Sequence, residues 1–121
     1  MQKVDLLKEY GLYINGEFVP ASDGTTFAAH NPANGEALAL CAEATKQDVD
    51  RAVKAAREAL TSWSKTSPIE RQNLLLKIAD IIDENKERLA LVETLDNGKP
   101  IRETMAADIP LGSDHFRYFA G

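Results

Sequence analysis

Hydrophobic and polar positions follow two different periods along this chain, and the period changes near residue 45. Between residues 12 and 44, short apolar runs separated by turn residues are typical of β-strands. From about residue 46 to residue 120, apolar residues recur every three or four positions, as on one face of an α-helix. The pattern predicts an α/β chain of 121 residues, with β-hairpin strands first and three or four α-helices after them.

Two turns define the predicted strand pairs. Asn15-Gly16 lies between Tyr13-Ile14 and Phe18-Val19 and fits a type I′ turn, which needs positive φ angles at both central residues. The segment NPANGE, from Asn31 to Glu36, separates a second pair formed by TTFAAH and ALALCAEA. One face of the last strand is expected to carry Leu38, Leu40 and Ala42, because side chains alternate along a strand.

Capping residues mark where the helices begin. Thr45-Lys46-Gln47-Asp48 is a variant capping box with Asp in place of the usual Glu, and Ser67-Pro68-Ile69-Glu70 is a stronger one with proline in the first turn. A break or bend is predicted around Asn85. The last helix starts near Pro100, and Pro110 is expected to kink it because an interior proline removes a backbone hydrogen bond.

Apolar stripes indicate which helix faces are covered. The first helix carries a stripe that ends at Trp63, which is expected in the core. The second helix is expected to bury Ile69, Leu75, Ile78, Ala79 and Ile82.

The stretch ETLDNGKP, from Glu93 to Pro100, joins two helices. Asn97-Gly98 ends the first helix, and Pro100 can open the next. Four charged residues surround this joint: Glu93, Asp96, Lys99 and Arg102. From the residues alone, they serve as caps and dipole partners, and Lys99 could hydrogen-bond the last carbonyls of the helix.

Composition narrows the class of protein. The length allows one domain, and the net charge of −5 with no basic stripe argues against a nucleic-acid partner. No apolar run approaches the roughly 20 residues that a membrane span requires. The charged N-terminus lacks the apolar core of a signal peptide, and the single cysteine, Cys41, fits a reducing compartment. We therefore expect a cytoplasmic protein.

The residues do not indicate a catalytic or cofactor-binding site. The closest two glycines are five residues apart, so no phosphate-binding glycine loop can be written. Cys41 is interpreted as a small half-buried residue and His115 as a surface or packing residue. Asp80, Asp83 and Glu84 could be paired carboxylates for acid–base chemistry, but one-turn spacing on a solvated face favours plain surface charge.

Several stretches, in order, resemble the N-terminal part of NAD(P)-dependent aldehyde dehydrogenases. They include YINGEFVPASDGTTFAAHNPANGEALA, DVDRAVKAAREAL, SPIERQNLLLKIADIIDENKERLALVETLDNGKP and HFRYFAG. Two of them hold family motifs, N-P-x-x-G-E (Asn31 to Glu36) and E-T-x-D-N-G-K-P (Glu93 to Pro100). Within the family, DNGKPIRE and DHFRYFA look most like bacterial enzymes that oxidise acetaldehyde and related short aldehydes.

The resemblance implies an α/β fold and, for the parent enzyme, oxidation of an aldehyde to a carboxylic acid with NAD or NADP. The family's catalytic cysteine, in G-Q-x-C, and its general-base glutamate, in E-L-G-G-K, have no counterpart here, nor has the nucleotide-binding G-x-T-x-x-G/P-W-N region. We therefore assign no catalytic or cofactor-binding residue to this chain, and expect no cofactor to bind it alone. In several family members a structural monovalent cation lies near the joint, which implies Asp96 and the carbonyl of Ala29 as ligands.

The resulting expectation is a truncated or fragment aldehyde dehydrogenase, with residues 1–121 as the incomplete N-terminal part of a subunit and with catalysis carried out by the parent enzyme. Whether the chain counts as an enzyme is therefore open, and alone it is expected to be inactive. Its partners would be the remaining dehydrogenase sequence or subunits, or further copies of itself, and not nucleic acid or a membrane. The alternative is a non-catalytic binding or assembly protein that docks on dehydrogenase subunits.

Overall fold

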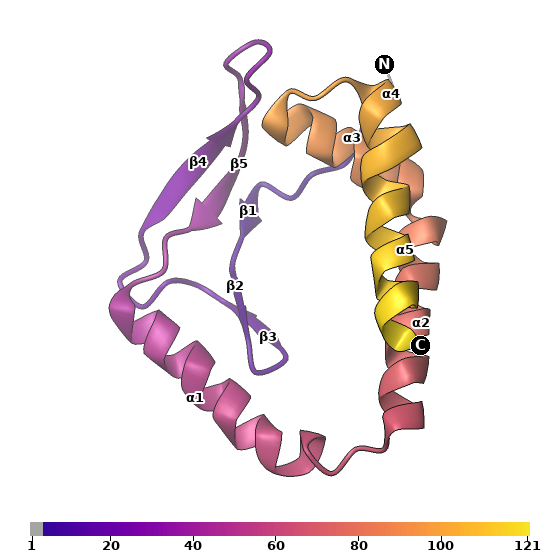
Figure 1. Cartoon of the computed structure of the whole chain (residues 1–121). Coiled ribbons are helices and arrows are strands. Elements are labelled where there is room, and N and C mark those ends of the chain that lie inside the picture. Colours follow the sequence, from indigo (N-terminus) through magenta and orange to yellow (C-terminus); the bar gives the residue numbers. More distant parts are fainter. Residues whose placement is uncertain (1–3) are drawn as a thin grey trace. The chain divides into compact units, whose positions relative to one another are not determined.

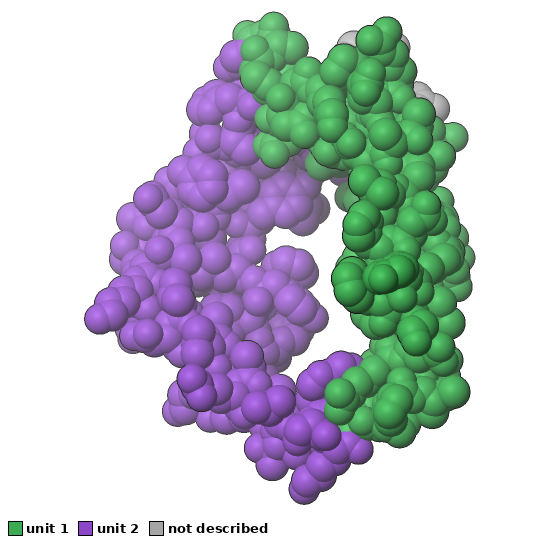
Figure 2. Space-filling view, in the orientation of Figure 1, with its two compact units in different colours: residues 1–4, 31–34, 66–121 green, residues 5–30, 35–65 purple. Residues whose placement is uncertain are grey.

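The computed structural model describes residues 4–121 and divides them into two compact units (Figure 2). Unit 1 comprises Val4, residues 31–34 and residues 66–121, and unit 2 comprises residues 5–30 and 35–65. All strands precede all helices, as the change of period predicted (Figure 1). None of the helices within residues 4–121 combines the length and the apolar character needed to cross a bilayer.

Unit 2 holds the strands in two small sheets. The strands are β1 (Glu9–Tyr10), β2 (Leu12–Ile14), β3 (Glu17–Val19), β4 (Thr26–His30) and β5 (Ala37–Ala42). One sheet pairs β2 with β3, and the other has the order β1-β5-β4. Sequence patterning missed β1, which has only two residues and runs parallel to β5. A two-residue strand is too short to show an alternating pattern. Residues 9 and 10 form a strand because they pair with β5.

The first predicted hairpin is confirmed. β2 and β3 are antiparallel, with Leu12 opposite Val19 and Ile14 opposite Glu17. The turn residues Asn15 and Gly16 have φ angles of 54° and 84°, the positive values that a type I′ turn demands.

The second strand pair is also confirmed, but the expected apolar face of β5 is not fully covered. The ladder passes from Ala29 opposite Ala39 to His30 opposite Ala37, so Leu38 is the extra residue of a β-bulge. The bulge interrupts the alternation of side chains. Leu40 is 43% exposed, whereas Leu38 and Ala42 are half-buried.

The capping box at the start of α1 (Lys46–Trp63) is confirmed. It also links this helix to a neighbouring loop. The Asp48 carboxylate accepts the Thr45 backbone N–H at 3.0 Å, and the Thr45 hydroxyl accepts the Asp48 N–H at 3.3 Å. The same carboxylate accepts the backbone N–H of Ser22 at 3.0 Å, which ties the β3–β4 loop to the helix. These bonds, from Ser22 first and then Thr45, lower the pKa of the buried Asp48 carboxyl to about 2.

The apolar stripe of α1 lies largely in solvent. Trp63 is 45% exposed, so its expected place in the core is wrong. Val49, Val53 and Leu60 are exposed as well. The helix contacts β2, where four alanines, Ala52, Ala55, Ala56 and Ala59, face Tyr13 to Gly16 across a shallow hollow.

Unit 1 is helical. It contains α2 (Pro68–Glu84), α3 (Lys86–Asn97), α4 (Ile101–Glu103), the π-helical segment η1 (Thr104–Asp108) and α5 (Ile109–Ala120). The Ser67 capping box, the break at Asn85 and the stop at Asn97-Gly98 are all confirmed. α2 and α5 run side by side and make the most extensive contact between elements (Figure 1).

The buried face of α2 is narrower than the sequence predicted. Ala79 is fully buried, and Leu75 and Ile82 are half-buried. Ile69 and Ile78 were expected to be buried, but they are 63% and 39% exposed. Each helical residue turns about 100° from the last, so Ile78 lies well to the side of Ala79. The apolar stripe of α2 is therefore wider than the part of its surface that α5 covers.

A kink was predicted at Pro110, and the structure has a π-helical turn directly before the helix that contains it. η1 occupies the five residues before Ile109, and Pro110 lies in the first turn of α5. The N–H of Ile109 bonds to the carbonyl of Thr104, five residues back, and this wider turn leaves room for a proline ring that would clash in an ordinary α-turn.

Asp48→Asn should remove an acid-sensitive part of the stability of unit 2. The folded pKa of Asp48 is depressed from 3.8 to about 2, so its contribution is present above 3.8 and is lost as pH falls toward 2. In acid titrations followed by circular dichroism, the difference between wild type and Asp48→Asn should shrink over that window.

Asp50→Asn is the matched control, because Asp50 is an exposed carboxylate on the same helix. Equal stability of wild type and Asp48→Asn at neutral pH would contradict the role given to Asp48.

Candidate functional site

The joint between α3 and α4 is built around a left-handed residue. Gly98 has a φ angle of 79°, and its N–H donates to the carbonyl of Thr94 at 3.0 Å. Glycine adopts this conformation without the steric cost that a Cβ brings. The side-chain oxygen of Asn97 accepts the N–H of Lys99 at 2.8 Å, so the chain turns at once toward Pro100.

Two polar contacts fix the end of α3 to η1. The buried hydroxyl of Thr104 donates to the carbonyl of Ile101 at 3.1 Å. Since that uses its only hydrogen, the Thr94 hydroxyl donates to Thr104 across 3.0 Å. The second contact is the ion pair of Lys99 with Asp108 at 2.5 Å.

The ion pair corrects the expected role of Lys99. The sequence allowed its ammonium group to hydrogen-bond the last carbonyls of α3, but it binds the Asp108 carboxylate instead. Asp108 raises the pKa of Lys99, chiefly by hydrogen bonding. The two residues are nine positions apart on either side of α4, so helix spacing alone did not indicate the pairing.

The two sequence motifs of the chain meet at this joint. The NPANGE turn contributes residues 31–34 to unit 1, and its Asn31 is buried with Oδ1 accepting the Ala33 N–H at 2.9 Å. A Cβ added to Gly98 would lie 2.9 Å from Cγ of Pro32. Packing of Pro32, as well as the backbone angle, therefore requires glycine at position 98.

The structure describes the two predicted cation ligands in separate units. Ala29 is half-buried in β4 of unit 2, opposite Ala39. Asp96 is an exposed residue in the last turn of α3 in unit 1. Within residues 4–121, no group of three or more His, Cys, Asp or Glu side chains could hold a metal ion.

A second polar cluster clamps α5 to α2. Arg117 contacts the carboxylates of Asp80 at 2.8 Å and Asp83 at 2.7 Å, and donates to the buried Ser113 hydroxyl at 2.6 Å. Hydrogen bonding to Ser113, and then to Arg117, lowers the pKa of Asp83. Asp80 and Asp83 are thus anions paired with a cation, which is a more specific role than the plain surface charge we predicted.

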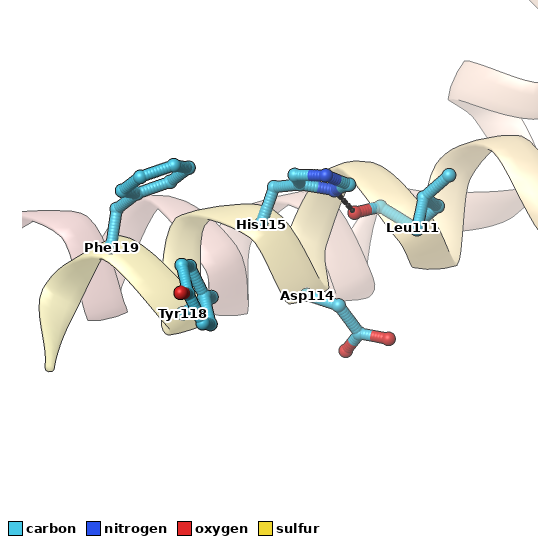
Figure 3. A pocket seen from close by; sticks show the side chains of 5 residues that line it. All are labelled: Leu111, Asp114, His115, Tyr118 and Phe119. Carbon is cyan, nitrogen blue, oxygen red and sulfur yellow. Dashed lines mark hydrogen bonds between the residues drawn. The ribbon is translucent and has the colours of Figure 1, made fainter.

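Neither of the residues considered for nucleophile or base chemistry lies in a reactive arrangement. Cys41 is a half-buried free thiol on β5, opposite Phe27. His115 is exposed on α5, and its Nδ1 is 2.7 Å from the carbonyl oxygen of Leu111 (Figure 3). Because a carbonyl only accepts, Nδ1 carries the hydrogen.

The outer side of α5 presents aromatic and apolar side chains. Leu111, Asp114, His115, Tyr118 and Phe119 line a shallow hollow there (Figure 3). Tyr118 and Phe119 are each more than 70% exposed and lie edge to face, with ring centroids 5.1 Å apart. Large exposed aromatic residues grouped on one helix indicate a surface that is covered by something else.

Comparison with known proteins identifies the class to which this architecture belongs. The aldehyde dehydrogenase family model matches residues 18–121. The chain belongs to the aldehyde dehydrogenase family. The joint and the NPANGE turn that pack together both fall inside the matched range.

Individual relatives agree in sequence and in fold. The chain is 54% identical to an acetaldehyde dehydrogenase of Pseudomonas aeruginosa over 112 residues, which are 93% of this chain and 22% of that protein. It is 51% identical to a probable aldehyde dehydrogenase of Streptomyces coelicolor over 98% of this chain and 23% of that protein. The NAD+ complex of an aldehyde dehydrogenase from Bacillus cereus matches with a TM-score of 0.91 and 46% identity, over 93% of this chain and 23% of that one. The chain therefore spans about a quarter of the length of these relatives.

Gly98→Ala should destabilise unit 1, because alanine at this position has an unfavourable φ angle and its Cβ meets Pro32. We expect a loss of roughly 1–3 kcal/mol in the free energy of unfolding, measured from the urea midpoint. Gly112→Ala is the control, because a Cβ there meets nothing within 4 Å. It lies within α5, so it should stabilise by about 0.5–1 kcal/mol. Equal effects of the two variants would contradict the assigned geometry.

Proposed function

We propose that this chain forms the N-terminal structural part of an NAD(P)-dependent aldehyde dehydrogenase, and that the whole enzyme oxidises an aldehyde to a carboxylic acid. The observation that carries the proposal is the joint: the two family motifs, far apart in sequence, pack together through Pro32 and Gly98. The family match across residues 18–121 supports the same assignment. In this proposal the segment supplies scaffold, and the reacting groups lie in sequence beyond it.

We infer that the dinucleotide of the whole enzyme is bound outside this segment. A phosphate group binds at free helix N-termini, where backbone N–H groups are unpaired. The N-termini of α1 and α2 are instead occupied by the carboxylates of their own capping boxes, Asp48 and Glu70. The solved B. cereus relative is an NAD+ complex, which supports NAD as a cofactor of the whole enzyme.

The purified chain should not reduce NAD+ or NADP+ when acetaldehyde is added. Cys41 is half-buried on a strand, and the thiolate rather than the thiol is the form that attacks an aldehyde. Absorbance of the reduced cofactor measures the result, with a full-length relative as the positive control. Turnover that Cys41→Ser abolishes would overturn the assignment of this segment as scaffold.

We infer further that Asp96 holds a structural monovalent cation together with the carbonyl of Ala29. A carboxylate in the last turn of a helix lies at the negative end of the helix dipole, where a cation offsets the unfavourable charge. The ammonium group of Lys99 is committed to Asp108, so it is not the counter-ion of Asp96. Oxygen ligands of this kind suit hard cations.

Replacing the residue equivalent to Asp96 by alanine in a full-length relative should reduce stability more than turnover. A charged hydrogen bond or cap of this kind contributes roughly 0.5–3 kcal/mol. The melting temperature of the wild type should rise when sodium or potassium replaces a large organic cation, and the variant should lose that rise. A Glu87→Gln equivalent, at an exposed carboxylate of α3, controls for loss of charge. Unchanged melting with lost turnover would refute the structural role.

The exposed apolar side chains favour a second candidate function, a non-catalytic protein that docks on dehydrogenase subunits. Val53 and Leu60 on α1, and Tyr118 and Phe119 on α5, are all exposed in the structure. In the first proposal these surfaces are covered by the rest of an aldehyde dehydrogenase subunit. In the second they bind a separate subunit. Both proposals require that the surfaces do not remain in water.

The isolated chain should therefore self-associate and bind a hydrophobic dye. Exposed apolar surface and strands without neighbours both drive association between chains. Sedimentation velocity of a dilute sample measures the association, and a double variant, Val53→Gln with Leu60→Gln, should reduce it. Lys54→Gln on the same helix is the control. A monomer that melts sharply and binds no dye would contradict the expectation, and co-sedimentation with a full-length relative would favour the docking function.

A further inference from the structure

Three Asn-Gly pairs in this chain have the same sequence but different structural settings. They are Asn15-Gly16, Asn34-Gly35 and Asn97-Gly98. Asparagine before glycine can lose its side-chain nitrogen as ammonia spontaneously. Glycine has no side chain to obstruct its backbone nitrogen, which can therefore attack Cγ of the asparagine. The rate depends on whether that nitrogen is free and whether the backbone can rotate. The structure therefore ranks the three pairs.

Asn97-Gly98 is exposed, but hydrogen bonds and packing hold it in place. The Gly98 N–H, which would have to lose its proton, donates to Thr94 at 3.0 Å. The Asn97 side chain is held at both ends, with Oδ1 accepting from Lys99 at 2.8 Å and Nδ2 donating to Glu93 at 3.4 Å. Pro32 packs against the Gly98 Cα and limits its rotation.

Asn34-Gly35 is partly protected. The Asn34 N–H donates to the carbonyl of Asn31 at 3.3 Å, and Asn34 takes part in a further interaction. Asn31 itself is buried, so the start of this turn is anchored. The Gly35 side of the turn is open, because a Cβ there would meet nothing within 4 Å.

Asn15-Gly16 is the least constrained pair. The β2–β3 ladder ends at Ile14 opposite Glu17, so both turn residues lie outside it, and both are exposed. A Cβ on Gly16 would meet nothing within 4 Å, which leaves space for the backbone to rotate. The strands have three residues each and form a sheet of only two strands, a size that is marginally stable in water. Such a tip opens locally far more easily than a packed helix end.

We propose that Asn15 is a site of spontaneous deamidation in the folded chain, and that the fold directs the reaction to this residue and away from Asn97. The Gly16 nitrogen loses its proton to solvent base and forms a bond to Cγ of Asn15. The bond from Cγ to the side-chain nitrogen breaks, and ammonia leaves, which gives a five-membered succinimide. Water then opens the ring to aspartate or isoaspartate. The net reaction consumes one water and releases one ammonia, with no oxidation or reduction.

The product changes the hairpin in two ways. A new carboxylate appears close to Glu17, so like charges lie together at the tip. Isoaspartate also adds one methylene to the main chain, and a two-residue type I′ turn has no place for an extra backbone atom. The modification thus loosens the pairing of β2 with β3, and β2 is the strand that contacts α1.

Incubation of the purified full chain at mildly alkaline pH, followed by proteolysis and mass spectrometry, tests the proposal. The replacement of –NH2 by –OH raises the peptide mass, and fragmentation distinguishes aspartate from isoaspartate. We expect the peptide with Asn15 to convert at least roughly tenfold faster than the peptide with Asn97, because local opening is easier at the hairpin tip. Conversion of Asn97 at a rate equal to or above that of Asn15 would overturn the proposal.

The same incubation in concentrated urea separates fold from sequence. Once the chain is unfolded, the rates at the three pairs should converge. If Asn15 kept its tenfold lead over Asn97 in urea, neighbouring residues rather than structure would explain the lead, and the proposal would fail. Asn15→Gly is the matched variant, since Gly-Gly also fits a type I′ turn, and it should remove the share of the acidic species that comes from residue 15 while conversion at Asn34 stays unchanged.

Discussion

The contact between Pro32 and Gly98 sets the organisation of unit 1. It requires glycine for two independent reasons, a positive φ angle and the lack of room for a Cβ. It also draws four residues of a turn between β-strands into a unit that is otherwise helical. The polar contacts of Thr94 with Thr104 and of Lys99 with Asp108 then hold η1 against the end of α3. A local backbone requirement and a long-range packing contact therefore coincide at one residue.

Local rules predicted the boundaries of the elements well. The caps at Thr45 and Ser67, the Asn15-Gly16 turn and the stop at Gly98 each depend on a few neighbouring residues, and the sequence displays those residues directly. Family resemblance added the fold and the two motifs. What neither supplied was the meeting of those motifs, because a contact between residues 32 and 98 has no local signal.

Predictions failed where the outcome depended on neighbours distant in sequence. Ile78 and Trp63 lie on apolar stripes, yet they are exposed because no described element covers those parts of the helices. Lys99 had plausible partners among nearby carbonyls, but an anion was available at Asp108. Arg117 escaped notice because its carboxylate partners are more than thirty residues away. Charged residues near a helix joint, such as Asp96 and Lys99, predict that ion pairs form there. They do not predict which charged residues pair with each other.

The π-helical turn at η1 changes how the side chains of α5 are rotated about the helix axis relative to those of α4. Each residue inserted into an α-helix rotates everything after it by about 100°, which would carry a buried face into solvent. A π turn absorbs an extra residue without passing on that rotation. Ser113, Arg117 and Ala120 can thus keep their places toward α2 whatever the preceding turn contains. Removal of one residue at η1 would convert the π turn to an α turn, and the helix pair beyond it would stay in register.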